Sequence, residues 1–568
     1  MSRIDYASIS HWLGVRDGRS VVARLCVCDM GCSVRLSRRF VADEAATALT
    51  DADLSDRTTR GVGWTVFWRF ATRGLGLIST LILARLLVPG DFGLVALASS
   101  FVVAIDALAT TGVYDVLIRE PGFQRPLYDT AFTIALIRGI VTATALALLA
   151  VPAGGFFDEP RLTPILLVVA VGTLIDSAEN TGTVDFRKYM RFDTEFVLLL
   201  LPRILGIMIT IAAALLLQSY WALVIGSLLQ KVVRVLLGYV LHPYRPRLSL
   251  SACRQILSFS IWLWAIAVAW FLRERSDTMI VGRMLDPFNL GLFLLSTEIA
   301  ALPATEFVLP VCRVLFSSFA AARNLNANLG PTFLNALGIV AAIVLPAGIG
   351  LALVSPALVP LMLGPAWTGA VPLVTILAPF GPLGAIAAIS STALIVTGHP
   401  NVAFAAGAVM AVARILLLVL GIHSLGIAGA AWATGVCLAI ECVLFTGLAL
   451  RLFGIRVVEL ISRTWRSVAA TAIMVITIVN LGLSDGLAGS KVDSPVVEVM
   501  IIACTGALVY VSSHLTLWLL SRRPTGAESF MLAQLSRVCP RLVARVVDGA
   551  VSVIVFSRQL LRPRRDEV

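Results

Sequence analysis

The chain consists largely of apolar runs of about 20 residues, separated by short polar segments. At about 1.5 Å of rise per residue, a helix of this length crosses roughly 30 Å of hydrocarbon. Because the runs are continuous and do not alternate between apolar and polar residues, they predict helices rather than the strands of a barrel. The predicted helices cover residues 64–84, 92–114, 129–151, 162–182, 196–217, 220–241, 256–281, 288–311, 332–354, 371–396, 401–420, 426–450, 467–484 and 497–520.

One segment of the first half of the chain returns in the second half. The sequence ARLLVPGDFGL at Ala84–Leu94 reappears as GRMLDPFNLGL at Gly282–Leu292, an offset of 198 residues (282 − 84) that also pairs Trp64 with Trp262. Six predicted helices separate equivalent points, and an even number gives the two halves the same, parallel topology. Internal repeats of this kind are typical of secondary transporters, whose substrate path lies between the halves.

The repeat divides the chain into lobes and flanking segments. We expect two six-helix lobes at residues 61–250 and 251–450, followed by a linker and a helix pair at 451–520. Residues 1–60 are polar and are expected to form a disordered cytoplasmic extension, and 521–568 a basic cytoplasmic tail. The helix pair carries almost no charge in mid-span, which favours a lipid-facing groove for a polyprenyl chain. A role in packing or membrane insertion is the alternative.

Composition places this fold in a membrane. Of the 568 residues, 58% are hydrophobic and 14% are charged, with a mean hydropathy of +0.91. A soluble core cannot bury so much apolar surface, so the predicted fold class is an all-α polytopic membrane protein with about fourteen transmembrane helices. Most loop Lys and Arg residues, such as Arg187, Arg245 and Arg451, fall on one side, which predicts cytoplasmic termini. This bias and the basic tails explain the net charge of +11 without nucleic-acid binding.

Arginines inside the predicted spans are the candidate substrate-binding residues, because a charge that faces lipid costs about 3 kcal/mol or more. Arg69 and Arg73 are four residues apart, so they share one helical face and can present two guanidinium forks to a pyrophosphate. Their alternative role is to reach lipid headgroups at the interface. Arg138 and Arg203 belong to the same candidate set.

The helix at 256–281 contains a further charge cluster. Arg273 and Arg275 are two residues apart and point to different faces, so we expect at most one of them at the substrate. The other is expected to pair with Glu274 or Asp277, and ion pairing could equally account for the whole cluster.

Carboxylates inside the spans are candidates for coupling transport to a proton or cation. In a medium of low dielectric constant the pKa of a carboxyl group rises, so it can titrate with the local gradient. The alternative is a structural ion pair with Arg138 or Arg203. Lys231 and Arg234 either share this region or mark the cytoplasmic end of a bent helix. The coupling candidates are Asp106, Asp176, Glu179 and Asp277.

Several motifs together resemble one protein family. They are ILARLLVPGDFGLVALA, TAFTIALIRGI at the start of the third helix, VDFRKYMRFD, IVGRMLDPFNLGLFLLS and MLGPAW before helix 10. In order and spacing they are similar to the Wzx-type polysaccharide-export flippases, in the superfamily that also holds the MATE drug exporters and lipid II flippases. The family often has a proline where this chain has Ser317, which affects the expected bend after helix 8.

The resemblance implies a function. It implies translocation of an undecaprenyl-pyrophosphate-linked oligosaccharide from the cytoplasmic to the periplasmic leaflet of a bacterial inner membrane, for surface polysaccharide synthesis. The implied partners are the lipid-linked oligosaccharide, membrane lipids, a polysaccharide polymerase and a chain-length regulator, and nucleic acid is not among them. The resemblance implies no enzymatic activity, no metal and no cofactor.

Other function classes fit the sequence less well. A glycan polymerase would carry a large periplasmic loop with catalytic Arg or His, whereas the outer loops here are short. A MATE-like drug or cation antiporter would need a mostly acidic or aromatic cavity, whereas several spans here contain arginine. The chain has no GxxxxGK loop, so ATP does not drive a cycle directly.

Overall fold

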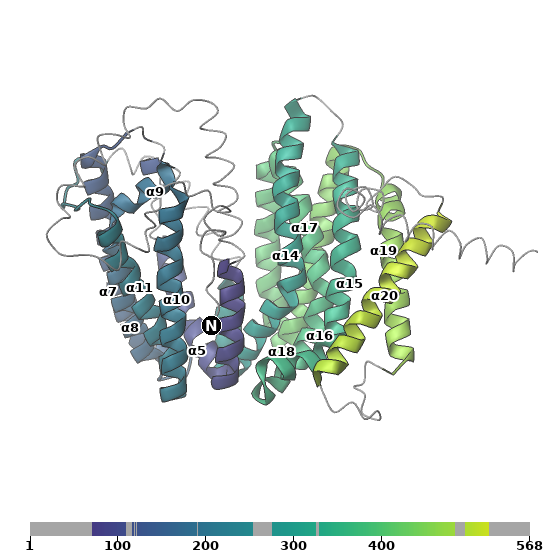
Figure 1. The fold of residues 1–568 in the computed structure, drawn as a ribbon, viewed down its shortest axis with the longest axis horizontal. Coiled ribbons are helices and arrows are strands. Elements are labelled where there is room, and N and C mark those ends of the chain that lie inside the picture. Colours follow the sequence, from purple (N-terminus) through teal and green to yellow (C-terminus); the bar gives the residue numbers. More distant parts are fainter. Residues whose placement is uncertain are drawn as a thin grey trace, which may run out of the picture.

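The computed structural model describes residues 71–108, 116–118, 120, 122–189, 191–253, 275–324, 329–482 and 495–521, with the backbone alone at 107–108 and 307–324. Within these ranges the regular elements are all helices (Figure 1). Nine of the described helices are long and apolar enough to cross a membrane, or ten if one bent pair counts as a single span. The predicted all-α polytopic membrane fold is therefore confirmed.

The first lobe, on the left in Figure 1, begins with a helix described from residue 71 to 86. The helices α7 and α8 pack together, as do α10 and α11, and α5 lies against α7 and α8. A short break between α8 and α10 contains one turn of 3-10 helix and the short helix α9. The bounds are α5 Pro89–Leu108, α7 Arg125–Phe156, α8 Leu162–Ser177, η1 Thr181–Thr183, α9 Val184–Lys188, α10 Phe192–Leu217 and α11 Trp221–Leu241.

The second lobe repeats this plan. It begins with a helix described from residue 275 to 284, and α14 packs against α15 and α17 while α17 packs against α18. The predicted helix 371–396 is divided in the structure into α16, η3 and α17, where Pro379 and Pro382 interrupt the backbone hydrogen bonds. The bounds are α14 Pro287–Asn324, α15 Gly330–Leu363, η2 Pro365–Ala370, α16 Val371–Leu377, η3 Ala378–Phe380, α17 Gly381–Val396 and α18 Pro400–Phe453.

The long element α18 is a hairpin of two helices rather than one span. Gly426 has φ 60° and ψ −136°, a conformation that suits glycine, and the backbones of Gly421 and Gly429 touch across the turn. Beyond the turn, Ala403 packs in the same cluster as Phe445. The predicted helices 401–420 and 426–450 are these two arms, so the break was placed correctly from the sequence.

The helices α19 (Val457–Asn480) and α20 (Pro495–Leu520) form a pair at the right edge of Figure 1. Both pack on α15, and the Tyr510 hydroxyl donates a hydrogen bond of 2.6 Å to the Ala342 carbonyl oxygen. Met474 and Ile502 pack in one cluster with Val354 of α15. The pair is thus anchored to the far side of the second lobe, and the proposed polyprenyl groove there stays a prediction.

The two lobes meet where the repeated motif makes its turn, at residues 87–88 and 285–286. In both copies the helix ends at the equivalent residue, 86 and 284, and the next helix begins with Pro89 and Pro287. A Cβ atom on Gly93 would overlap the Pro287 carbonyl, and one on Gly291 would overlap that of Pro89. Because these glycines are 198 residues apart, α5 and α14 cross backbone to backbone about a pseudo-two-fold axis. We call this end of the bundle the closed end.

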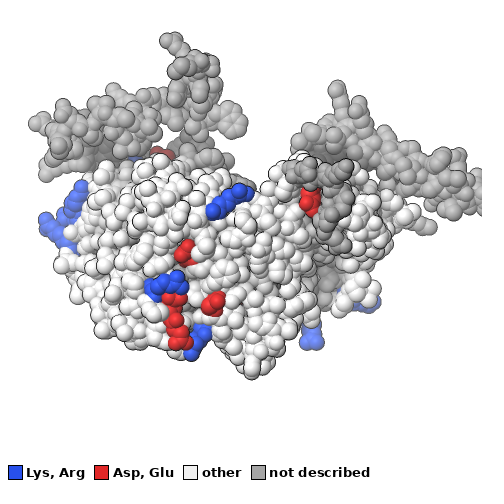
Figure 2. Space-filling view, turned by 90° about the horizontal axis from the view of Figure 1, so that it is seen from below, with Lys and Arg blue, Asp and Glu red and all other residues white. Residues whose placement is uncertain are grey.

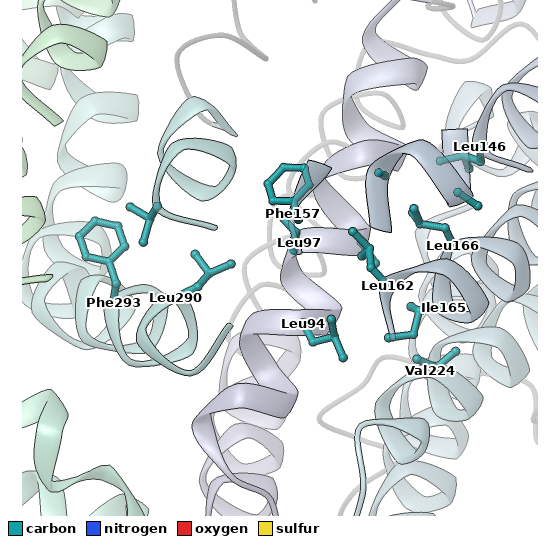
Figure 3. Packing of buried hydrophobic residues seen from close by; sticks show 14 of the residues in the cluster. Leu94, Leu97, Leu146, Phe157, Leu162, Ile165, Leu166, Val224, Leu290 and Phe293 are labelled. Atoms are coloured by element: carbon teal, nitrogen blue, oxygen red, sulfur yellow. The ribbon is translucent and has the colours of Figure 1, made fainter. Parts of the chain in front are cut away.

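A buried apolar cluster fills the space behind this crossing. Figure 3 shows Leu290 and Phe293 of α14 on one side of α5 and α8 residues such as Leu162 on the other side. Leu94 and Leu97, at the start of α5, belong to the same cluster and are each 1% exposed. At roughly 2 kcal/mol for burying each large apolar side chain, this packing favours contact between the lobes at the closed end.

Candidate functional site

Six ionisable side chains meet inside the first lobe, between α5, α7, α8 and α11. They line a cavity of about 190 Å³, which we call the polar pocket. Three are carboxylates and three are cations, so the charges balance. Five of them lie in helices, ten or more residues from the helix end at the closed end, that is, at least about 15 Å along the helix, and Glu179 follows the other end of α8. The six are Asp106, Arg138, Asp176, Glu179, Lys231 and Arg234.

Glycine and serine allow the helices around the polar pocket to approach closely. A Cβ on Gly139 of α7 would overlap the Ser177 side chain of α8, so these helices touch at that level. On α8, a Cβ on Gly172 would lie 3.6 Å from the Cδ of Lys231, whose stem crosses that position. Small residues on α7 and α8 therefore make room for charges from α11.

The ion pairs of the polar pocket satisfy its charges only in part. Lys231 Nζ lies 4.0 Å from Asp176 Oδ2, and Arg234 Nη2 lies 3.2 Å from Glu179 Oε2. Among the described residues, the buried atoms Arg138 Nε and Asp176 Oδ1 have no hydrogen-bond partner. A buried polar atom without a partner costs about 1–3 kcal/mol, so the pocket is suited to a bound water or ion.

The structure thus separates the arginines that the sequence placed in one set. Arg138 lies in the polar pocket with the coupling candidates. Arg203 of α10 reaches the helix 71–86, where a Cβ on Gly76 would lie 2.9 Å from its guanidinium. The partners of Asp176 and Glu179 are the α11 cations, so the alternative pairing with Arg138 or Arg203 is replaced by pairing with Lys231 and Arg234.

Between the lobes, Arg73 of the helix 71–86 donates a hydrogen bond of 2.9 Å from Nε to Glu306 of α14. Their side chains are 38% and 39% exposed, and Glu298, about 16 Å along α14 from its start, is exposed as well. Charges at this depth cannot face lipid, so they line a space between the lobes. Arg69 and Arg273 lie outside the described residues.

The second lobe contains its own buried ion pair. Asp277 accepts hydrogen bonds from Nε and Nη2 of Arg414 on α18, and the side chains are 11% and 16% exposed. Glu441, 6% exposed on the second arm of α18, interacts electrostatically with the same arginine. The sequence suggested that Asp277 pairs with an arginine on its own helix, but its carboxylate is bonded to Arg414. Arg275, the first described residue of this helix, is half-buried.

At the closed end two arginines, equivalent in the repeat, reach across to the other lobe. Arg85 donates hydrogen bonds to the carbonyl oxygens of Leu361 and Met362 at the end of α15, the latter at 3.3 Å. Arg283 lies 3.5 Å from Asp158, which follows α7 in the first lobe. Both arginines stand at the same position of the repeated motif.

The surface around these contacts carries few charges. Figure 2 looks onto the lower end of Figure 1 and shows a group of neighbouring acidic and basic side chains on a largely uncharged face. Among the charges of the α7–α8 loop, the Arg161 guanidinium donates two hydrogen bonds of 2.8 Å to Glu159. These bonds hold the pKa of Glu159 below its ordinary value. The ion pair between Arg161 and Glu159 therefore stabilises the α7–α8 loop, which faces Arg283.

At the opposite end, the segment that links the lobes is fixed to the first turns of α7. The Tyr244 hydroxyl donates to Asp129 at 2.5 Å, and the backbone N–H of Ser249 donates to the Thr133 hydroxyl at 2.9 Å. Burial and the bond to Asp129 raise the pKa of Tyr244, which keeps this donor protonated. Thr133 of the TAFT motif therefore helps to anchor the segment that links the lobes.

The sequence model of a protein family described as "Polysaccharide biosynthesis protein" matches residues 82–372, which is just over half of the chain. The chain belongs to this family. The family resemblance predicted from the motifs is thereby confirmed, and the matched range contains both copies of the repeated motif and the polar pocket.

Relatives of known role point the same way. The chain is 26% identical over 341 residues to lipopolysaccharide biosynthesis protein WzxC of Escherichia coli K12, covering 59% of this chain and 68% of the relative. It is 24% identical over 323 residues to succinoglycan biosynthesis transport protein ExoT of Rhizobium meliloti 1021, covering 56% and 65%. The chain thus matches about two thirds of each relative. A transport protein rather than an enzyme was predicted, and these relatives agree.

Solved structures share the fold. The lipid II flippase MurJ in an inward closed conformation superposes with a TM-score of 0.64 and 14% identity, over 81% of this chain and all of MurJ. An inward-facing MATE multidrug transporter gives 0.53 and 15% identity, over 67% and 94%. At such low identity the likeness shows the arrangement of helices and leaves the substrate to be argued from the site.

Proposed function

We propose that this protein moves an undecaprenyl-pyrophosphate-linked oligosaccharide across the bacterial inner membrane by alternating access. The observation that carries the proposal is the set of exposed charges between two repeat-related lobes that meet at one end. Arg73, Glu298 and Glu306 are accessible charges on helices that face each other across the two lobes, which suits a hydrophilic sugar and phosphate headgroup rather than lipid. A long prenyl chain can remain in hydrocarbon while the headgroup crosses.

The cations between the lobes receive the pyrophosphate. Arg73 lies on the helix 71–86 and Arg203 reaches the same helix, and we expect Arg69, one turn from Arg73, and one of Arg273 or Arg275 to join them. Guanidinium forks bind phosphate oxygens in a bidentate manner, which an ammonium group cannot do. In the structure Glu306 accepts a hydrogen bond from Nε of Arg73, and the phosphate replaces Glu306 when substrate enters.

The polar pocket serves as the coupling site. Asp106, Asp176 and Glu179 lie beside cations from α7 and α11, so protonation or cation binding would change the balance of charge between these helices. Asp277 is held by Arg414 and is assigned a structural role in the second lobe instead. Arg138, with its unpaired Nε, belongs to this coupling site rather than to the substrate.

The closed end faces the periplasm. The basic loops fall at the opposite end, where Arg125, Arg187, Lys188 and Arg245 lie, and the positive-inside rule places that end and both termini in the cytoplasm. In this orientation the lobes are shut towards the periplasm, and the site between them is loaded from the cytoplasmic side. A polymerase and a chain-length regulator would act on the delivered product.

A deletion strain tests the function. Cells that lack the protein should accumulate lipid-linked oligosaccharide on the cytoplasmic side and lose surface polysaccharide, and the plasmid-borne gene should restore export. Replacing Arg73 by Lys should reduce export several-fold although the charge is kept, because the bidentate fork is lost. The matched control is Arg456→Lys, an exposed residue outside both lobes. Absence of the accumulated lipid in the deletion strain would refute the proposal.

A further inference from the structure

The two seams between the lobes at the closed end are equivalent in the repeat but differ in structure. One seam lies between the helix 71–86 and the end of α15, and the other between the helix 275–284 and the end of α7. The pseudo-two-fold axis through Gly93 and Gly291 relates them. The packing of each seam determines whether a lipid chain can pass through it.

The first seam is filled and bonded. Trp367 of η2 is fully buried there, and its Nε1 donates a hydrogen bond of 2.7 Å to the Ala84 carbonyl oxygen. Its ring packs edge-on against Phe92, and Leu363 and Ala370 complete the cluster. Arg85 closes the surface by bonding the carbonyl groups at the end of α15. A chain cannot pass here unless a buried tryptophan is displaced.

The second seam is an open apolar groove of about 510 Å³, a size typical of ligand pockets. We call it the lateral groove. Its walls come from both lobes: Leu149, Phe156 and Phe157 from the α7 side, Met279 and Met284 from the helix 275–284. Methionine side chains adapt to irregular apolar ligands, and no tryptophan from an insertion such as η2 lies among these wall residues.

One charge lies at the mouth of the lateral groove. Arg283 lines it, with its guanidinium carbon 5.1 Å from the centre of the Phe156 ring. The Arg283 side chain is 47% exposed and the Asp158 side chain 80% exposed, so this ion pair is accessible and weak. A phosphate could replace Asp158, which would remain solvated. An apolar groove with an arginine at its mouth complements an apolar chain that ends in a phosphate.

We propose that the lateral groove holds the isoprenoid chain of the lipid-linked substrate at the closed end, with Arg283 at its phosphate. The inference rests on the proposed function, because a headgroup between the lobes requires its chain to pass through a seam. The seam at Trp367 is sealed, so the chain takes the other one. The closed end therefore opens on one side, and the released lipid leaves between α7 and the helix 275–284.

Photocrosslinking tests the occupant directly. A benzophenone amino acid would replace Leu149, which lines the groove and is 42% exposed, or Leu148, its neighbour, which is 72% exposed and outside the groove. Each protein would be placed in vesicles of phosphatidylethanolamine and phosphatidylglycerol with undecaprenyl pyrophosphate, irradiated, and analysed by intact mass. We expect a prenyl adduct at least several-fold more abundant at position 149. Phospholipid adducts alone at 149, or equal prenyl adducts at both positions, would overturn the proposal.

Export measurements give a second arm. Leu149→Trp fills the groove and should lower export several-fold, whereas Leu148→Trp projects into lipid and should leave it unchanged. Wild-type export from the Leu149→Trp protein would overturn the proposal. The proposed function fails separately, if the deletion strain does not accumulate lipid-linked oligosaccharide. If that lipid accumulates but the crosslinks at position 149 contain no prenyl chain, only the proposed role of the lateral groove is refuted.

Discussion

Gly93 offers the sharpest perturbation of the closed end. Its missing side chain lets α5 touch the Pro287 carbonyl of α14, and a methyl group at this position would overlap that oxygen. Forcing extra volume into a packed contact costs about 1–3 kcal/mol, which would shift the equilibrium between closed and open forms roughly 5- to 150-fold. Gly93→Ala should therefore favour separation of the lobes at this end without unfolding either lobe.

Disulfide formation can report this shift. Gly90 and Phe288 are equivalent in the repeat, and a Cβ on Gly90 would lie 3.9 Å from the Cβ of Phe288, a distance suited to a disulfide. Cysteines at 90 and 288 should crosslink in high yield under mild oxidation, and adding Gly93→Ala should lower the yield several-fold. Gly155→Ala is the control, because no atom lies within 4 Å of its Cβ. Unchanged crosslinking with Gly93→Ala would refute the backbone-contact account of the closed end.

The buried ion pair of the second lobe gives a prediction about stability. Asp277→Leu should lower the melting temperature strongly, since a lone buried Arg414 costs about 3–5 kcal/mol, and adding Arg414→Leu should restore most of the lost stability. Equal melting temperatures for the single and double variants would contradict this expectation. Truncation after Phe453 removes α19 and α20. If this helix pair binds the polyprenyl chain, as the sequence predicts, the truncated protein should be stable and inserted but should not export. A stable truncated form that still exports would refute that role. Because its pKa is depressed, Glu159 should stabilise the α7–α8 loop above about pH 4.5 and lose this effect at lower pH; a loss beginning near pH 6 in hydrogen exchange would be inconsistent.

Periodicity and the repeat predicted most of the fold. The ends of the helices at 86 and 284 coincide in the repeat, and both arms of α18 were expected from the sequence. Helix ends were less accurate: α7 continues to Phe156 and α15 to Leu363, five and nine residues beyond the predicted ends. Hydropathy marks the hydrocarbon region, whereas a helix can extend into the polar interface wherever its backbone groups are satisfied.

The site was predicted only as a set of charges. From the sequence, Arg73 and Arg138 were both predicted to bind substrate, because both are arginines inside spans. In the structure Arg73 pairs with Glu306 between the lobes, whereas Arg138 lines the polar pocket. Partner choice depends on contacts between distant helices, such as Lys231 with Asp176, which spacing along one helix cannot reveal. The difference between the two seams depends on how Trp367 folds back onto Ala84, 283 residues away in the chain.

In the proposed function, separation of the lobes at the closed end delivers a lipid-linked oligosaccharide. The most direct measurement uses vesicles that contain the purified protein with cysteines at 90 and 288 and the lipid-linked oligosaccharide extracted from the deletion strain. Transfer between leaflets is followed by the fraction of glycan exposed to an external glycosidase. We expect transfer with the reduced protein, arrest when the disulfide forms, and recovery after reduction. Transfer at the same rate with the closed end locked would contradict it.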